Sequence, residues 1–105
     1  MDDLNALAEE HLAAAREHPH GRSAHLVLHD QPLRQSLIAL TVGTTLDEHL
    51  SPPAGSLLVL RGTVRLTAAS GDVELGPGFL HALPPDPHAL TALTDAVLLL
   101  TAVNP

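Results

Sequence analysis

The sequence predicts an all-β domain, a sandwich or barrel of short strands, preceded by one α-helix. Two observations carry this prediction. The hydrophobic period changes at Gly21, from helical spacing to short apolar or alternating runs. Gly, Pro, Asp or Ser residues separate those runs, as is typical of strands in sandwiches and barrels. The length of 105 residues fits a single domain.

The first twenty residues predict a helix appended to the β domain. Its apolar face has the i, i+3, i+4 spacing of Leu4, Leu7, Ala8, His11, Leu12 and Ala15. Asp2 or Asp3 can cap its N-terminus, and "HPHG" (18–21) ends it. The expected division is therefore a helix within residues 1–20, packed on the barrel or on a partner subunit, and a β-barrel over residues 21–105.

The strands are expected in six runs after Gly21. These are "SAHLVLHD" (23–30), "LRQSLIALTVG" (33–43), "SLLVLRGTVRLTA" (56–68), "GDVELGPG" (71–78), "FLHALPP" (79–85) and "HALTALTDAVLLLTAV" (88–103). Within them "ASGD" (69–72) predicts a hairpin turn, and "LRG" (60–62) predicts a bend or bulge.

Composition argues against several classes of partner. The formal charge is -7 with no lysine, whereas phosphate contacts need an excess of positive charge, so we expect neither nucleic acid nor a membrane as partner. Phe79 is the single aromatic residue, which leaves almost nothing for stacking on bases. There is no cysteine for disulfides or thiolate metal sites. The acidic start and the short apolar runs lead us to expect a cytoplasmic protein.

The sequence contains two motifs in which glycine, histidine and proline residues have a characteristic spacing. In the first, five residues separate Gly43 from His49; Ser51 and Gly55 follow, and Gly62 comes after six more residues. The second is "GPGFLHALPPDPHAL" (76–90), in which two prolines precede His88. Both resemble the motifs of small single-domain cupins (the cupin 2 type conserved barrel), and the resemblance covers about residues 33–103. It implies a double-stranded β-helix, the cupin jelly-roll barrel, with one added N-terminal α-helix.

The resemblance also bears on metal chemistry, because cupins hold a metal ion with three histidines and a glutamate. Ser51 and Gly55 stand where the family has a histidine and the glutamate. Of the family's metal ligands, the resemblance therefore leaves only His49 and His88 in this sequence. Catalytic zinc sites usually have three protein ligands, and non-heme iron uses two histidines and a carboxylate. We therefore expect no cofactor and no tightly bound metal.

A rearranged metal site is the alternative. It would hold a divalent ion such as Zn, Fe, Mn or Ni through His49, His88 and a third ligand. The candidates for that ligand are His81, Asp47 and Asp86.

The expected small-molecule-binding residues are His49, Ser51, Phe79, His81 and His88. Whether His81 faces the barrel lumen is left open by the sequence. His25 and His29 are expected to share one strand face as a solvated pair.

Three functions remain open at this point. The first is a metal-free module that binds or senses a small molecule in an apolar pocket with a few polar anchors. The second is a divalent-metal enzyme of the dioxygenase or isomerase type. The third is a dimer-forming domain with a vestigial pocket. A homodimer is expected because the run 89–103 is apolar on both strand faces, and one small barrel covers only one of them.

Overall fold

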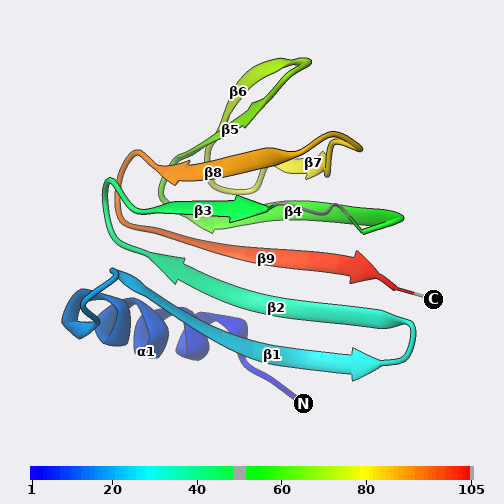
Figure 1. Ribbon diagram of the computed structural model, residues 1–105. Helices are drawn as coiled ribbons and strands as arrows, with labels where there is room; N and C mark the ends of the chain where they lie inside the picture. Colours follow the sequence, from blue (N-terminus) through cyan, green and yellow to red (C-terminus); the bar gives the residue numbers. More distant parts are fainter. Residues whose placement is uncertain (49–51, 105) are drawn as a thin grey trace.

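A computed structural model describes residues 1–48 and 52–104. It has one helix, α1 (Leu4–Glu17), and nine strands. The strands are β1 (Arg22–Asp30), β2 (Leu33–Leu40), β3 (Thr45–Glu48), β4 (Ala54–Arg61), β5 (Val64–Ala68), β6 (Gly71–Leu75), β7 (Leu80–Ala82), β8 (His88–Ala92) and β9 (Ala96–Val103). Figure 1 shows their arrangement. No helix of the described residues is long and apolar enough to cross a membrane.

The strands form two antiparallel sheets that face each other. The five-stranded sheet has the order β1-β2-β9-β4-β7, and the four-stranded sheet has the order β3-β8-β5-β6. Strands distant in sequence, such as β2 and β9, pair in the same sheet, as a jelly roll requires. The predicted all-β jelly-roll barrel with one N-terminal helix is therefore confirmed.

The space between the sheets is filled by aliphatic side chains. Alternation along each strand puts Leu57 and Val59 of β4, Leu90 of β8 and Leu98 of β9 into this core, where each is at most 1% exposed. The middle of the lumen is thus packed protein.

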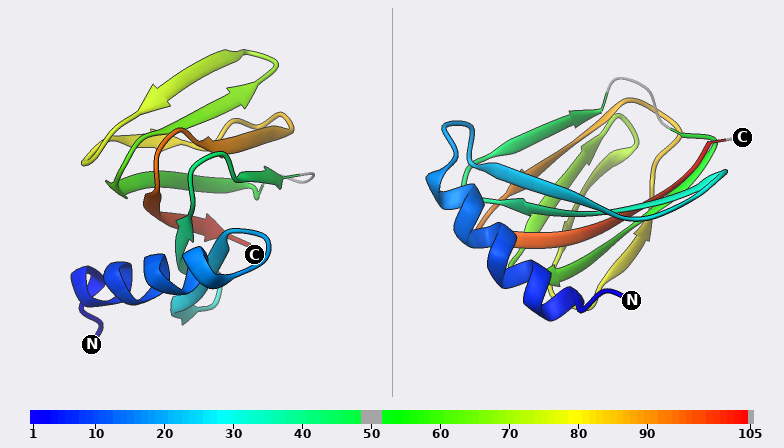
Figure 2. Two further views of the ribbon diagram at one scale, coloured as in Figure 1. Left: turned by 90° about the vertical axis from the view of Figure 1, so that its left-hand side faces the viewer. Right: turned by 90° about the horizontal axis from the view of Figure 1, so that it is seen from below.

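The helix covers the opposite face of the five-stranded sheet. Figure 2 (right) shows this sheet lying between α1 and the four-stranded sheet. Ala8 and Ala15 of α1 are buried against Leu37 and Ala39 of β2 and Val97 of β9. Asp3 caps the helix by accepting hydrogen bonds from the backbone N–H groups of Asn5 (3.0 Å) and Ala6 (3.3 Å), and the helix ends at the cap residue His18.

The helix also covers some of the apolar side chains of β9, the strand that led us to expect a homodimer. Along β9, Leu98 and Leu100 face the core, and Val97 on the other face is fully buried by α1. Leu99, on the same face as Val97, is not part of the cluster that packs against α1 and stays partly exposed. Intramolecular packing therefore covers part of the apolar surface for which the sequence led us to expect a partner.

Candidate functional site

Two of the predicted site residues that the structure describes, His81 and His88, lie where β7 ends and β8 begins, at the right-hand end of the barrel in Figure 1. His49 and Ser51 lie outside the described residues. For His81 and His88, the strand pairing decides which face each side chain occupies.

His81 faces the lumen, which answers the question left open by the sequence. It is the pairing partner of Leu57, and paired residues on neighbouring strands share a face. Leu57 is fully buried in the core, so His81 belongs to the inner face, near an end where it is only half-buried. Its Nδ1 lies 2.6 Å from the carbonyl oxygen of Ala82. A carbonyl only accepts, so Nδ1 carries the proton and Nε2 is the acceptor of the neutral ring.

His88 faces the lumen from the opposite sheet. It is 5% exposed and begins the alternating buried face of β8 that continues with Leu90 and Ala92. Its Nδ1 donates to the carbonyl oxygen of Asp86 at 3.1 Å, so this ring has the same tautomer as His81. On β5 its pairing partner is Ala68, so the small side chain of Ala68 lies beside it on the same face.

Gly55 stands where the resemblance places the family's glutamate, and that place is occupied. A Cβ atom added to Gly55 would lie 2.7 Å from Leu83 Cδ1, 2.7 Å from the carbonyl oxygen of Thr101 and 3.2 Å from Pro52 Cγ. Contacts under 3.0 Å essentially never occur for real Cβ atoms. Leu83 packs against the core in this space, so any side chain at position 55 would force its neighbours to shift.

Two expectations about other polar residues were wrong. Asp47 pairs with Ala89 and is exposed, while its neighbour Leu46 pairs with the buried Leu90, so Asp47 points away from the lumen. His25 and His29 do not share a face. A β-bulge between Leu26 and Leu28 reverses the alternation after His25.

Phe79 and Asp86 complete the predicted set. Phe79 precedes β7, and its side chain is 58% exposed, so it is not enclosed among the lumen side chains. Asp86 lies in the turn before β8, where its backbone oxygen orients His88. Among the described residues, no three His, Asp or Glu side chains are grouped closely enough to hold a metal ion.

A hollow of about 320 Å³ lies at the same end of the four-stranded sheet, and residues from both faces of the sheet line it. Its lining residues are Asp47, Thr67, Ala68, Ala69, Pro87, His88 and Ala89. Asp47, Thr67 and Ala89 form one row across β3, β5 and β8, on the face opposite the core. No sequence pattern indicated this hollow, because it depends on which strands become neighbours.

Sequence reasoning also missed a polar contact between α1 and β1. His11 Nδ1 lies 2.7 Å from Ser23 Oγ, and the rings of His11 and His25 stack with their centroids 5.5 Å apart. The sequence pattern pointed to a buried contact of His11, since this residue stands on the apolar face of the helix. The pattern could not identify the contacting residues, because they depend on which face of the sheet carries His25.

Comparisons with known proteins bear on the fold. No family model matches the sequence, and no curated protein sequence matches it. Among solved structures, the TT1209 protein from Thermus thermophilus is 24% identical with a TM-score of 0.77, and the match covers 100% of this chain and 98% of that one. A cupin superfamily protein from Desulfitobacterium hafniense is 16% identical with a TM-score of 0.72, over 80% of this chain and 78% of that one.

One similar structure is an enzyme, a salicylate 1,2-dioxygenase from Pseudaminobacter salicylatoxidans. It is 16% identical with a TM-score of 0.77, and the match covers 93% of this chain but 33% of the dioxygenase. Identities this low establish a shared fold and leave activity open.

Proposed function

From the premise that this chain is a small single-domain barrel with the cupin fold, we propose that it binds a small molecule without a resident metal ion. The observation that carries the proposal is the filled space at Gly55. Where the resemblance places a metal-binding carboxylate, Leu83 packs against the backbone instead. An aliphatic contact in that place favours an apolar ligand over a divalent cation, because an ion there would lack the charge that offsets its desolvation.

The ligand site is the end of the lumen between β7 and β8. Its floor is aliphatic, with Leu57 fully buried and Leu83 and Leu100 packed against the core. Its polar groups are the inward-facing imidazoles of His81 and His88. An apolar pocket with a few placed polar groups is the usual composition of a small-molecule site.

The tautomers indicate the kind of ligand. Both neutral rings use Nδ1–H on a backbone carbonyl, which makes Nε2 the acceptor of each. A ligand that binds to His81 Nε2 must therefore carry a hydrogen-bond donor. We expect a small, mainly apolar molecule with a hydroxyl group. The formal charge of -7 also disfavours strongly anionic ligands.

Nuclear magnetic resonance titration tests this proposal. A panel of small phenols and aliphatic alcohols would be added to ¹⁵N-labelled protein purified without a tag. We expect saturable shifts at residues 55–57, 81–83 and 100, and at least a fivefold weaker affinity in His81→Ala. The variant His20→Ala, changed at an exposed histidine outside the barrel end, is the matched control. Shifts confined to the outer-face residues Thr67 and Ala89 would move the site out of the lumen and contradict the proposal.

We also propose that the protein forms a homodimer. The support is a row of leucines across the outer face of the five-stranded sheet, Leu80 of β7, Leu58 of β4 and Leu99 of β9. The row continues into Leu37, which the helix buries, while Leu80 is 68% exposed. A second copy that covers the open part of this row would extend the same apolar layer.

A further inference from the structure

We propose that the seam between α1 and β1 holds a divalent transition-metal site, in which the imidazoles of His11 and His25 are the two protein ligands and Ser23 orients the first of them. This site lies on the outer face of the five-stranded sheet and is separate from the barrel end. The cation class is Zn²⁺, Ni²⁺ or Cu²⁺, the divalent ions that suit imidazole nitrogen.

The spacing of the two rings fits chelation. Their centroids are 5.5 Å apart, with an angle of 30° between the planes. A zinc ion about 2.1 Å from a nitrogen lies about 3.2 Å from that ring's centroid, so two imidazoles at a tetrahedral angle have centroids about 5.2 Å apart. The observed centroid separation is therefore within a few tenths of an ångström of the separation in a chelating pair.

Ser23 supplies the support that a ligand histidine needs. Its Oγ lies 2.7 Å from His11 Nδ1, and a hydroxyl can accept as well as donate. When Nδ1–H donates to Ser23 Oγ, the lone pair of the neutral ring is on Nε2, the nitrogen that binds metal. Metal-ligating histidines almost always donate their second N–H in this way.

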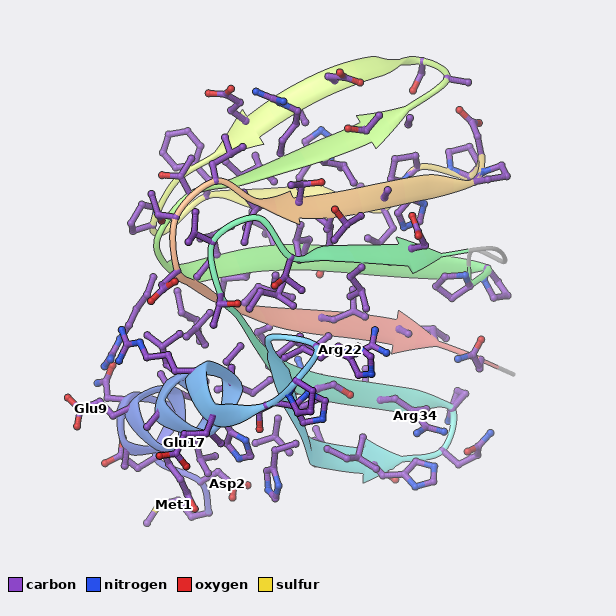
Figure 3. All side chains as sticks on the ribbon, turned by 60° about the vertical axis from the view of Figure 1, so that its left-hand side comes forward. Met1, Asp2, Glu9, Glu17, Arg22 and Arg34 are labelled. Atoms are coloured by element: carbon purple, nitrogen blue, oxygen red, sulfur yellow. The ribbon has the colours of Figure 1, made fainter. Side chains whose placement is uncertain are left out.

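The backbone fixes both ligands on regular elements. His11 is half-buried on α1, and His25 is exposed on β1, one residue pair along from Ser23 on the same sheet face. Solvent reaches the site through the exposed ring of His25, so water can complete the coordination shell. Figure 3 shows the acidic side chains of Glu9 and Glu17 on the solvent side of the helix, away from the sheet.

A second histidine pair serves as an internal comparison. His18 and His20 have ring centroids 5.6 Å apart, nearly the same separation. Here, however, His18 Nδ1 accepts a hydrogen bond from the backbone N–H of His20 at 3.0 Å. That bond puts the proton of the neutral His18 ring on Nε2, so neither nitrogen is available to a metal. Ring spacing alone does not make a site.

The consequence is a metal-dependent link between the helix and an edge strand. An ion bound to the native state alone raises stability with its concentration, so added Zn²⁺ should raise the melting temperature. Two imidazoles without a carboxylate hold such an ion weakly, since zinc sites in proteins usually have three or four protein ligands. The site would therefore empty on dialysis and refill when zinc is added.

Isothermal titration calorimetry with ZnCl₂ on tag-free protein, together with thermal melts, tests the proposal. We expect one saturable site in the native protein, and at least a tenfold loss of affinity in both His11→Ala and His25→Ala. His25 is exposed, so its variant folds even if His11→Ala loosens the helix. Ser23→Ala should weaken affinity about tenfold, as loss of the hydrogen-bond partner behind a metal ligand commonly does.

The matched control is His20→Ala, which should bind zinc as the native protein does. Unchanged zinc affinity in His25→Ala, or no saturable binding below millimolar zinc, would overturn the proposed site. Binding that survives in His25→Ala but disappears in His88→Ala would place the ion in the barrel, and would contradict the metal-free lumen as well. Absence of zinc binding altogether would overturn the seam site and leave the proposed small-molecule function untouched.

Discussion

At the scale of single residues, Gly55 is the position where the structure adds most to the sequence. The sequence identifies a missing carboxylate, which on its own suggests an empty place. The structure replaces the empty place with a contact, since Leu83 Cδ1 and the Thr101 carbonyl oxygen occupy the space that a side chain needs. Leu83 lies 28 residues further along the chain, so no local pattern could indicate that it would fill this position.

Gly55→Ala should therefore destabilise the protein, by about 1–3 kcal/mol, because overpacking forces neighbours to shift. Gly76→Ala is the matched control, since a Cβ there would meet nothing within 4 Å. Urea denaturation measures both. Gly55→Glu should be less stable still and should gain no metal affinity. An unstrained Gly55→Ala, as stable as Gly76→Ala, would show that the space is open after all.

Asp95 provides a second residue-scale prediction, because it links three segments. Its Oδ1 accepts from the backbone N–H of Val42 at 2.9 Å, and its Oδ2 accepts from Arg16 Nε at 3.1 Å. The hydrogen bond from Val42, followed by that from Arg16, lowers the pKa of the Asp95 carboxyl below its ordinary value of 3.8. A lowered folded-state pKa stabilises the protein above the unfolded pKa, and this contribution is lost as the pH falls through the folded value.

Asp95→Asn should accordingly remove about 1 kcal/mol of stability at neutral pH, and the deficit relative to the native protein should shrink below about pH 4. Arg16→Gln should have a smaller effect, because Arg16 is the second cause of the shift. Chemical denaturation between pH 3 and pH 7 gives both curves. A deficit for Asp95→Asn that stays constant across this range would contradict the assignment.

At the scale of elements, the parts predicted best were those set by local chemistry. The helix face, the Asp3 cap and the β5–β6 hairpin at 69–70 all follow from nearest-neighbour spacing. The bend at 60–62 appears as a register shift between Val59 and Arg61 with a left-handed Gly62.

The errors arose where pairing decides the outcome. A bulge in β1 separated His25 from His29, and the pairing of β3 with β8 turned Asp47 outward. Neither the bulge nor the register has a signature within its own strand. The fold was therefore largely predictable from the sequence, whereas the orientation of candidate ligands was only partly so.

Helix docking gives a prediction at this scale. Ala15 is fully buried between α1 and the sheet, while its neighbour Ala14 is exposed. Ala15→Leu should lower the free energy of unfolding by about 1–3 kcal/mol through overpacking, and Ala14→Leu should stay within about 0.5 kcal/mol of the native protein. Equal stabilities in urea denaturation would mean that the helix does not pack on the sheet in this way.

At the scale of the whole molecule, the open part of the outer sheet face gives the proposed dimer its test. Leu80→Glu places a charge in the leucine row and should shift the protein toward monomer, since an interface of more than about 1,000 Å² would have to bury it. Val42→Glu changes an equally exposed side chain in the β2–β3 turn and should leave the assembly unchanged. Sedimentation velocity at tens of micromolar, well above the dissociation constants of stable dimers, distinguishes them. A native protein that sediments as a monomer would refute the dimer.

The proposed barrel binds its ligand without a resident metal ion. Metal analysis by inductively coupled plasma mass spectrometry tests it most directly, on tag-free His25→Ala protein so that the seam site does not contribute. After dialysis against metal-free buffer without chelator, we expect less than about one-tenth of an equivalent of any transition metal, because two imidazoles alone hold such ions weakly. Near-stoichiometric metal that His49→Ala or His88→Ala then removes would contradict the metal-free barrel.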